Sequence, residues 1–84
     1  MPRLPREVED WRRFEPEERL ALIRVRRKHL HLTQAQAGQL ADYGVNYVSQ
    51  LERGKAPLVR EAFIKLIGAY HAYELAPDES KEVT

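Results

Sequence analysis

With 84 residues, a formal net charge of +1 and no cysteine, the chain is long enough for one domain but too short to enclose a large catalytic pocket. The absence of cysteine excludes disulfides, thiolate nucleophiles and cysteine-based zinc sites. No apolar run reaches the roughly 18 residues that span a bilayer, and the first residues lack the apolar core of a signal peptide. We therefore expect a soluble, cytoplasmic protein with no membrane partner.

The small net charge hides a basic centre. Between Arg24 and Lys55, six basic residues stand against two acidic ones, so this segment carries +4 while the rest of the chain carries −3. Such a concentration of positive charge favours contact with a polyanion. The alternative is that the basic residues only solvate a helix surface, and charge by itself leaves both open.

Residues 1–15 are predicted to be an N-terminal extension, for which two interpretations exist. In the first, a short helix follows Pro5 and packs Val8 and Trp11 against the domain. In the second, the segment is a basic arm that enters a minor groove through Arg3, Arg6, Arg12 and Arg13. Glu7, Glu9 and Asp10 in the same segment would repel phosphates, which favours packing.

From residue 16 onward the apolar residues recur at helical spacing, without the period-two alternation that is typical of a strand. A first helix is predicted at 16–30, because Pro16 suits a first turn and the neighbouring glutamates suit the positive end of the helix dipole. Thr33 and Gln36 have the spacing of a capping box, which predicts a second helix at 34–41.

A third helix is predicted at 45–53, ended by Gly54. In the turn before it, either Asp42 or Gly44 is expected to take left-handed backbone angles. A fourth helix follows Pro57, because apolar residues recur at helical spacing at Val59, Ala62, Phe63, Leu66, Ala69, Tyr70 and Tyr73.

These elements predict an all-α fold, a compact bundle of four to five helices. The bundle is expected to occupy residues 16–75, followed by a polar C-terminal tail at 76–84 that has almost no apolar content.

The central residues carry a resemblance to a known family. Its motif comprises a Thr-Gln start, small residues in the second helix and a Val-Ser-x-Leu-Glu-Arg-Gly end, here Thr33, Gln34, Ala37, Gly38, Val48, Ser49, Leu51, Glu52, Arg53 and Gly54. This set resembles the helix-turn-helix signature of the Cro/CI-like, or xenobiotic-response-element, family of DNA-binding domains. The resemblance extends over about residues 20–70 and implies a lambda-repressor-like fold and double-stranded DNA as partner.

The resemblance also implies roles for individual residues. Arg27 and Glu52 are expected to form a structural lock between the first and third helices. The bases are expected to be read in the major groove by Val45, Asn46, Tyr47 and Gln50. Contacts with DNA phosphates are expected from Thr33, Gln34, Arg53, Lys55, Arg24 and Lys28.

The turn departs from the family pattern, with Asp42 where a glycine is usual and Gly44 where a Ser or Thr cap is usual. Glycine is tolerated as an N-cap and Asp tolerates turn conformations, so the fold is expected to survive. This departure leaves open at which residue the third helix, the recognition helix that enters the major groove, begins. If Asn46 is the cap, Val45 leaves the base-reading set.

Enzymatic function is not expected. The only imidazoles are those of His29, His31 and His71, and the first two do not share a helical face, which disfavours a metal site. No phosphate-binding glycine loop or nucleophile elbow is present. We therefore expect no catalytic residues, no metal and no cofactor.

The sequence predicts a transcriptional regulator, a dimeric repressor on a palindromic operator. Apolar residues late in the fourth helix exceed what a small core needs, so a homodimer interface is predicted at Tyr70, Tyr73 and Leu75, with core packing as the alternative. A second candidate function is an antitoxin-type module that binds a toxin partner as well as its own promoter. Phage repressors and restriction controller proteins share the same signature.

Overall fold

The computed structural model describes residues 11–76, and within them every regular element is a helix. A single 3-10 turn, η1 (Trp11–Arg13), precedes four α-helices: α2 (Pro16–His29), α3 (Gln34–Ala41), α4 (Val45–Glu52) and α5 (Arg60–Leu75). The predicted all-α bundle with a helix-turn-helix is thereby confirmed. Residues 1–10 and 77–84, which include the predicted arm residues Arg3 and Arg6 and most of the polar tail, lie outside the described range.

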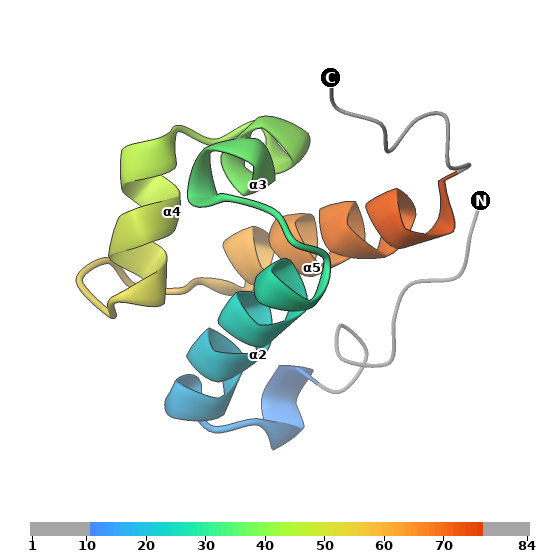
Figure 1. The fold of residues 1–84 in the computed structure, drawn as a ribbon. Helices are drawn as coiled ribbons and strands as arrows, with labels where there is room; N and C mark the ends of the chain where they lie inside the picture. Colours follow the sequence, from blue (N-terminus) through green and yellow to red (C-terminus); the bar gives the residue numbers. More distant parts are fainter. Residues whose placement is uncertain (1–10, 77–84) are drawn as a thin grey trace.

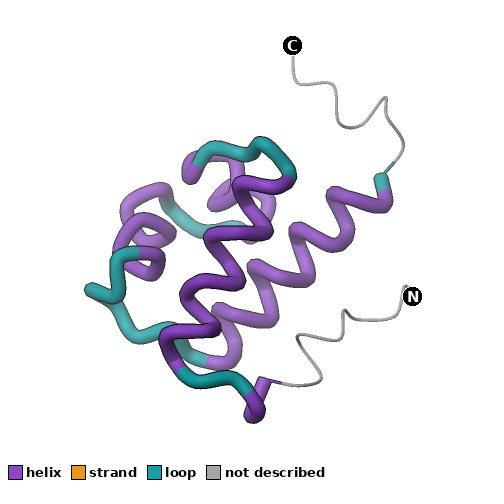
Figure 2. Tube along the Cα trace, turned by 60° about the horizontal axis from the view of Figure 1, so that its bottom comes forward, coloured by secondary structure: helices purple, strands orange, loops and turns teal. Residues whose placement is uncertain are grey.

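The helices pack around one apolar centre, to which all four contribute. α3 contacts α4 and α5, and α2 contacts the same two helices. Figure 1 shows α2 passing in front of α5 and α4 at the outer edge of the molecule, and Figure 2 shows the two long helices α2 and α5 side by side. The buried apolar residues are Ile23, Leu32, Ala37, Ala41, Val48, Leu51, Ala62, Phe63, Leu66, Ile67 and Tyr70. The small α3 residues in this list allow α3 to approach its neighbours closely.

Local signals account for most helix boundaries. Pro16 occupies the first turn of α2, and Glu15 and Glu18 form a capping box there. α5 begins only at Arg60, because residues 57–59 have no regular structure and the extended Val59 is the N-cap. Pro57 thus marks the end of the preceding loop and not the start of the helix.

Trp11 packs onto the bundle. Its ring centroid lies 4.9 Å from that of Phe63, and the Arg19 guanidinium lies 3.8 Å from the Trp11 ring. Arg19 Nε also donates to the Trp11 carbonyl at 3.0 Å. This contact agrees with the packing interpretation for Trp11, whereas Arg12 and Arg13 are exposed.

Candidate nucleic-acid interface

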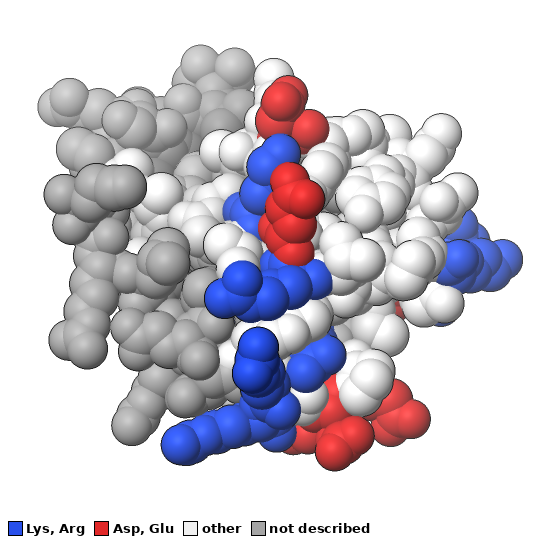
Figure 3. Space-filling view, turned by 180° about the vertical axis from the view of Figure 1, so that it is seen from behind, with Lys and Arg blue, Asp and Glu red and all other residues white. Residues whose placement is uncertain are grey.

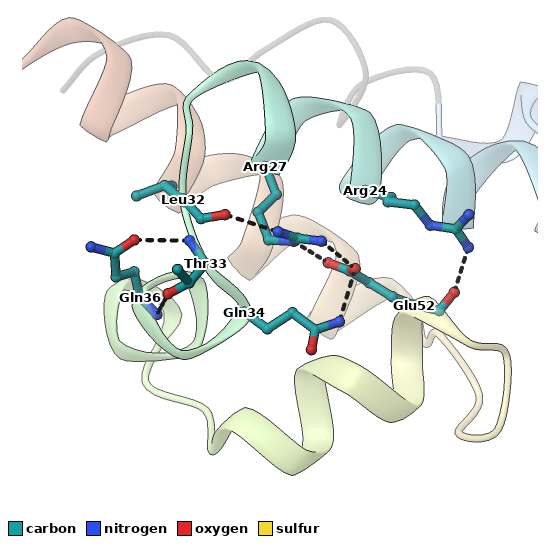
Figure 4. Close-up of polar contacts among 7 residues, drawn as sticks. All are labelled: Arg24, Arg27, Leu32, Thr33, Gln34, Gln36 and Glu52. Carbon is teal, nitrogen blue, oxygen red and sulfur yellow. Dashed lines mark hydrogen bonds and ion pairs between the residues drawn. The ribbon is translucent and has the colours of Figure 1, made fainter.

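The site consists of α3, α4 and the turn between them, and its first determinant is the capped start of α3. Thr33 Oγ1 accepts a hydrogen bond from the Gln36 backbone N–H at 3.1 Å, and Gln36 Oε1 accepts one from the Thr33 backbone N–H at 2.8 Å. Both bonds are drawn in Figure 4. This reciprocal pair fixes where α3 begins and leaves the positive end of its dipole at the surface, since Thr33 is exposed.

The turn after α3 determines the register of α4. Asp42 takes the left-handed conformation, with φ 62° and ψ 43°, whereas Gly44 is extended and is the N-cap of α4. Of the two expected candidates, Asp42 is therefore the left-handed residue. Because Gly44 and not Asn46 is the cap, Val45 is the first residue of α4, and it is 47% exposed.

Gly38 makes the tight turn possible. The Tyr43 backbone N–H donates to the Gly38 carbonyl at 2.6 Å, and a Cβ on Gly38 would lie 2.5 Å from the Tyr43 carbonyl oxygen. No side chain fits at that distance, so the crossing of α3 and α4 requires glycine at this position.

Glu52, at the end of α4, ties three helices together. Its carboxylate is 4% exposed and accepts two hydrogen bonds from Arg27 of α2, Nε to Oε2 at 2.7 Å and Nη2 to Oε1 at 2.9 Å. Gln34 of α3 donates Nε2 to Oε1 at 3.2 Å. These contacts, shown in Figure 4, form a bidentate fork with a third donor, which sets the orientation of α4 relative to α2 and α3.

Two further bonds complete this arrangement. Arg27 Nη1 donates to the Leu32 carbonyl at 2.8 Å, and Arg24 Nη2 donates to the Glu52 carbonyl at 2.7 Å. Arg24 therefore places a positive charge on a backbone carbonyl at the end of α4, where the helix dipole is negative. We name the set Arg24, Arg27, Gln34 and Glu52 the Glu52 hub.

The charges of the hub stabilise each other. Burial by itself raises the pKa of Glu52, but the hydrogen bonds from Arg27 and Gln34 and the charges of Arg27 and Arg24 outweigh it, so the pKa lies below its ordinary value. The hydrogen bond to Glu52 likewise raises the pKa of Arg27 against the opposing effect of burial. The pair is thus fully ionised at neutral pH.

The predicted base-reading residues on the outer side of α4 differ in how far they are exposed. Val45, Asn46 and Gln50 are exposed. Tyr47 is half-buried, and its ring packs edge-on against Tyr43 with centroids 4.9 Å apart. The Tyr47 ring therefore supports the turn, while the amides of Asn46 and Gln50 are fully on the exposed side as hydrogen-bonding groups.

The predicted phosphate-contacting residues divide into two groups. Thr33, Lys28, Arg53 and Lys55 are exposed. Gln34, which is half-buried, and Arg24, which is exposed, each donate one hydrogen bond to Glu52, so both also have a structural role.

Charge is distributed unevenly over the surface. α4 lies on the left in Figure 1 and hence on the right in Figure 3, where the surface is largely uncharged apart from a group of Lys and Arg atoms at the edge of the view. Nearer the middle of Figure 3, Lys and Arg alternate with Asp and Glu in a band. The only charged residue of α4, Glu52, is buried. A phosphate backbone beside α4 therefore meets no exposed carboxylate from this helix.

The predicted dimer residues are not on one surface. Tyr70 is fully buried, Tyr73 is half-buried and Leu75 is 61% exposed. Tyr70 belongs to the core, because it lies on the side of α5 that faces α2 and α3, so its assignment to a dimer interface is wrong. Of the three, Leu75 alone offers a large exposed apolar side chain.

One residue of the site, Tyr43, and the capping role of another, Arg24, were not found from the sequence. Tyr43 supports Tyr47 and has Lys65 Nζ 4.9 Å from its ring centroid; two tyrosines four positions apart were the available signal. Burial, together with the neighbouring Tyr47 and Glu61, raises the pKa of Tyr43. The capping role of Arg24 had no local signal, because its acceptor is 28 positions away.

Two short helices joined by a tight turn, with the second exposed along one side, define a DNA-binding helix-turn-helix domain. The chain belongs to the helix-turn-helix domain family, a family of XRE/Cro-like domains, whose model matches residues 19–82. No curated protein and no solved structure matches the chain. Among residues 11–76, no helix has the length and apolar content to cross a membrane.

Proposed function

We propose that the protein is a sequence-specific transcriptional regulator that binds double-stranded DNA as a homodimer and represses from a palindromic operator. The observation that supports this proposal is the outer side of α4, where Asn46 and Gln50 are exposed and the buried Glu52 hub fixes the helix orientation. A major groove about 12 Å wide accepts one helix, and amides pair with adenine through two hydrogen bonds.

Phosphate contacts frame this reading surface. Arg53 and Lys55 follow α4 directly and are exposed, and the capped start of α3 carries the exposed Thr33. Cations directly after α4 and the N-terminus of α3, whose Gln34 bonds to Glu52 at the end of α4, suit contacts with the sugar-phosphate backbone. The protein acts by binding and not by catalysis. Within the described residues no group of three His, Asp or Glu side chains could hold a metal ion.

The test measures binding of the purified protein to a duplex from the region upstream of its own gene, by fluorescence anisotropy over a series of salt concentrations. We expect affinity to fall steeply with salt, since each neutralised phosphate releases counterions. Absence of salt-sensitive binding to this duplex would favour the second candidate function, a toxin-binding interaction module.

Two variants separate base reading from phosphate contact. Gln50→Ala is expected to weaken binding to the preferred site by about 1 to 3 kcal/mol and to relax preference at one base pair. Arg53→Ala is expected to weaken binding to every sequence alike and to flatten the salt dependence by about one unit of slope. Equal losses on all sequences for Gln50→Ala would refute the role given to Gln50.

A further inference from the structure

The outer side of α2 carries an apolar stripe that no element of the described bundle covers. Phe14, Ala21, Leu22 and Val25 line a shallow groove there together with Glu18. Val25 is 61% exposed. Ile23 is fully buried and points the other way, into the core, and Leu22 packs partly against that core, whereas Ala21 and Val25 are exposed and are not part of the core packing.

Charges flank this stripe in a self-complementary order. The first turn of α2 is acidic, with the exposed Glu17 and Glu18, and Lys28 is the exposed cation of the basic last turn, since Arg27 is paired with Glu52. Glu17, Ala21, Val25 and Lys28 follow one another at spacings of four, four and three, so they form one continuous row on the helix surface.

An antiparallel second copy satisfies both the apolar stripe and the charges. A two-fold axis that crosses α2 between positions 22 and 23 lies about 8 Å along the helix from both Glu17 and Lys28. Glu17 of each chain then faces the partner's Lys28, and the small Ala21 lies beside the partner's Val25. A parallel arrangement would instead place like charges together.

We propose that the outer face of α2 is the homodimer contact, with α2 packed antiparallel against α2 of a second copy, Val25 at its centre and Glu17–Lys28 pairs at both ends. This inference names the dimer contact of the regulator proposed above and so rests on that proposal. It replaces the face predicted at the end of α5.

The test compares Val25→Glu with Leu75→Glu, measuring molecular mass by sedimentation equilibrium from low micromolar to near-millimolar protein. Both side chains are 61% exposed, so neither substitution removes core packing. We expect wild type and Leu75→Glu to dimerise and Val25→Glu to remain a monomer with unchanged helicity. The proposal is overturned if wild type is monomeric throughout, or if Leu75→Glu dissociates the dimer and Val25→Glu does not.

Charge reversal tests the antiparallel register. Glu17→Lys and Lys28→Glu each replace two attractive pairs by two repulsive ones, so each should raise the dimer dissociation constant about tenfold or more. The double variant restores both pairs and should return close to wild type. An equimolar mixture of the two single variants should form heterodimers, because every contact then joins opposite charges. Failure of both the double variant and the mixture to recover would refute this register.

The outcomes also separate this inference from the function. If the wild type is a dimer that binds DNA and the Val25→Glu variant is still a dimer, the α2 contact is overturned and the proposed regulator function stands. If Val25→Glu dissociates the dimer but the wild type shows no salt-sensitive DNA binding, the α2 contact is supported and the proposed regulator function is overturned.

Discussion

Gly38→Ala tests the tight crossing of α3 and α4. In an unobstructed helix, replacing Gly by Ala stabilises a protein by about 1 kcal/mol. Here the new Cβ would stand 2.5 Å from the Tyr43 carbonyl oxygen and 3.3 Å from Val48 Cγ2. The first distance must grow by about 0.9 Å, to 3.4 Å, to become an ordinary contact, and the obstacle is backbone, which does not rotate away.

The expected magnitude follows from these opposing effects. Forcing a methyl group into a packed site costs about 1 to 3 kcal/mol. The strain also lengthens the hydrogen bond from Tyr43 N–H to the Gly38 carbonyl, now 2.6 Å. After the gain in helix propensity we expect a net loss of about 1 to 2 kcal/mol. For a domain of this size, each kcal/mol lowers Tm by about 4 to 8 °C.

The matched control is Gly68→Ala in α5. No atom lies within 4 Å of a Cβ built at Gly68, so the same substitution should stabilise the protein by about 0.5 to 1 kcal/mol. The assay is urea unfolding followed by circular dichroism, where equal m-values show that both variants unfold from the same compact state. A Gly38→Ala protein as stable as wild type would refute the reasoning.

Further predictions concern buried polar groups. Because Glu52 has a lowered pKa in the folded state, its contribution to stability is complete above its unfolded pKa and is lost as pH falls through the folded pKa, below the ordinary value of 4.5. In Glu52→Gln, urea unfolding at pH 7 should show a loss of about 3 kcal/mol, since Arg27 stays buried without its ionic partner, and the acid-side decline should become shallower. Exposed Glu17→Gln is the control, and an unaltered pH profile in Glu52→Gln would contradict the assignment. The Tyr70 hydroxyl is buried without a hydrogen-bond partner, so Tyr70→Phe should be as stable as wild type or more stable, by up to about 1 to 3 kcal/mol. A lower Tm for Tyr70→Phe would show that this hydroxyl is satisfied in solution.

Local sequence signals were sufficient for the helices. The Thr33–Gln36 capping box and the position of α3 at 34–41 were predicted from residues a few positions apart, and the structure has α3 at those bounds. Caps and apolar periodicity act within one or two turns, so they can be recognised without knowledge of the fold.

The tertiary structure decided what each side chain of the motif does. The sequence left open whether Gly44 or Asn46 caps α4, because both residue types are acceptable caps. Packing of α3 against α4 at Gly38 and the left-handed Asp42 selected Gly44, and this placed Val45 in the helix.

The tertiary structure also decided which apolar side chains are buried. Apolar spacing predicted that Tyr70 and Tyr73 share one side of a helix, but it could not tell a core side from an interface side. Burial depends on which helices cross α5, and those contacts join residues far apart in the chain. The sequence by itself therefore determined the elements and the family motif. The structure alone decided that Tyr70 is core, that Tyr47 supports the turn and that α2 leaves an apolar face open, because each depends on the long-range packing of helices.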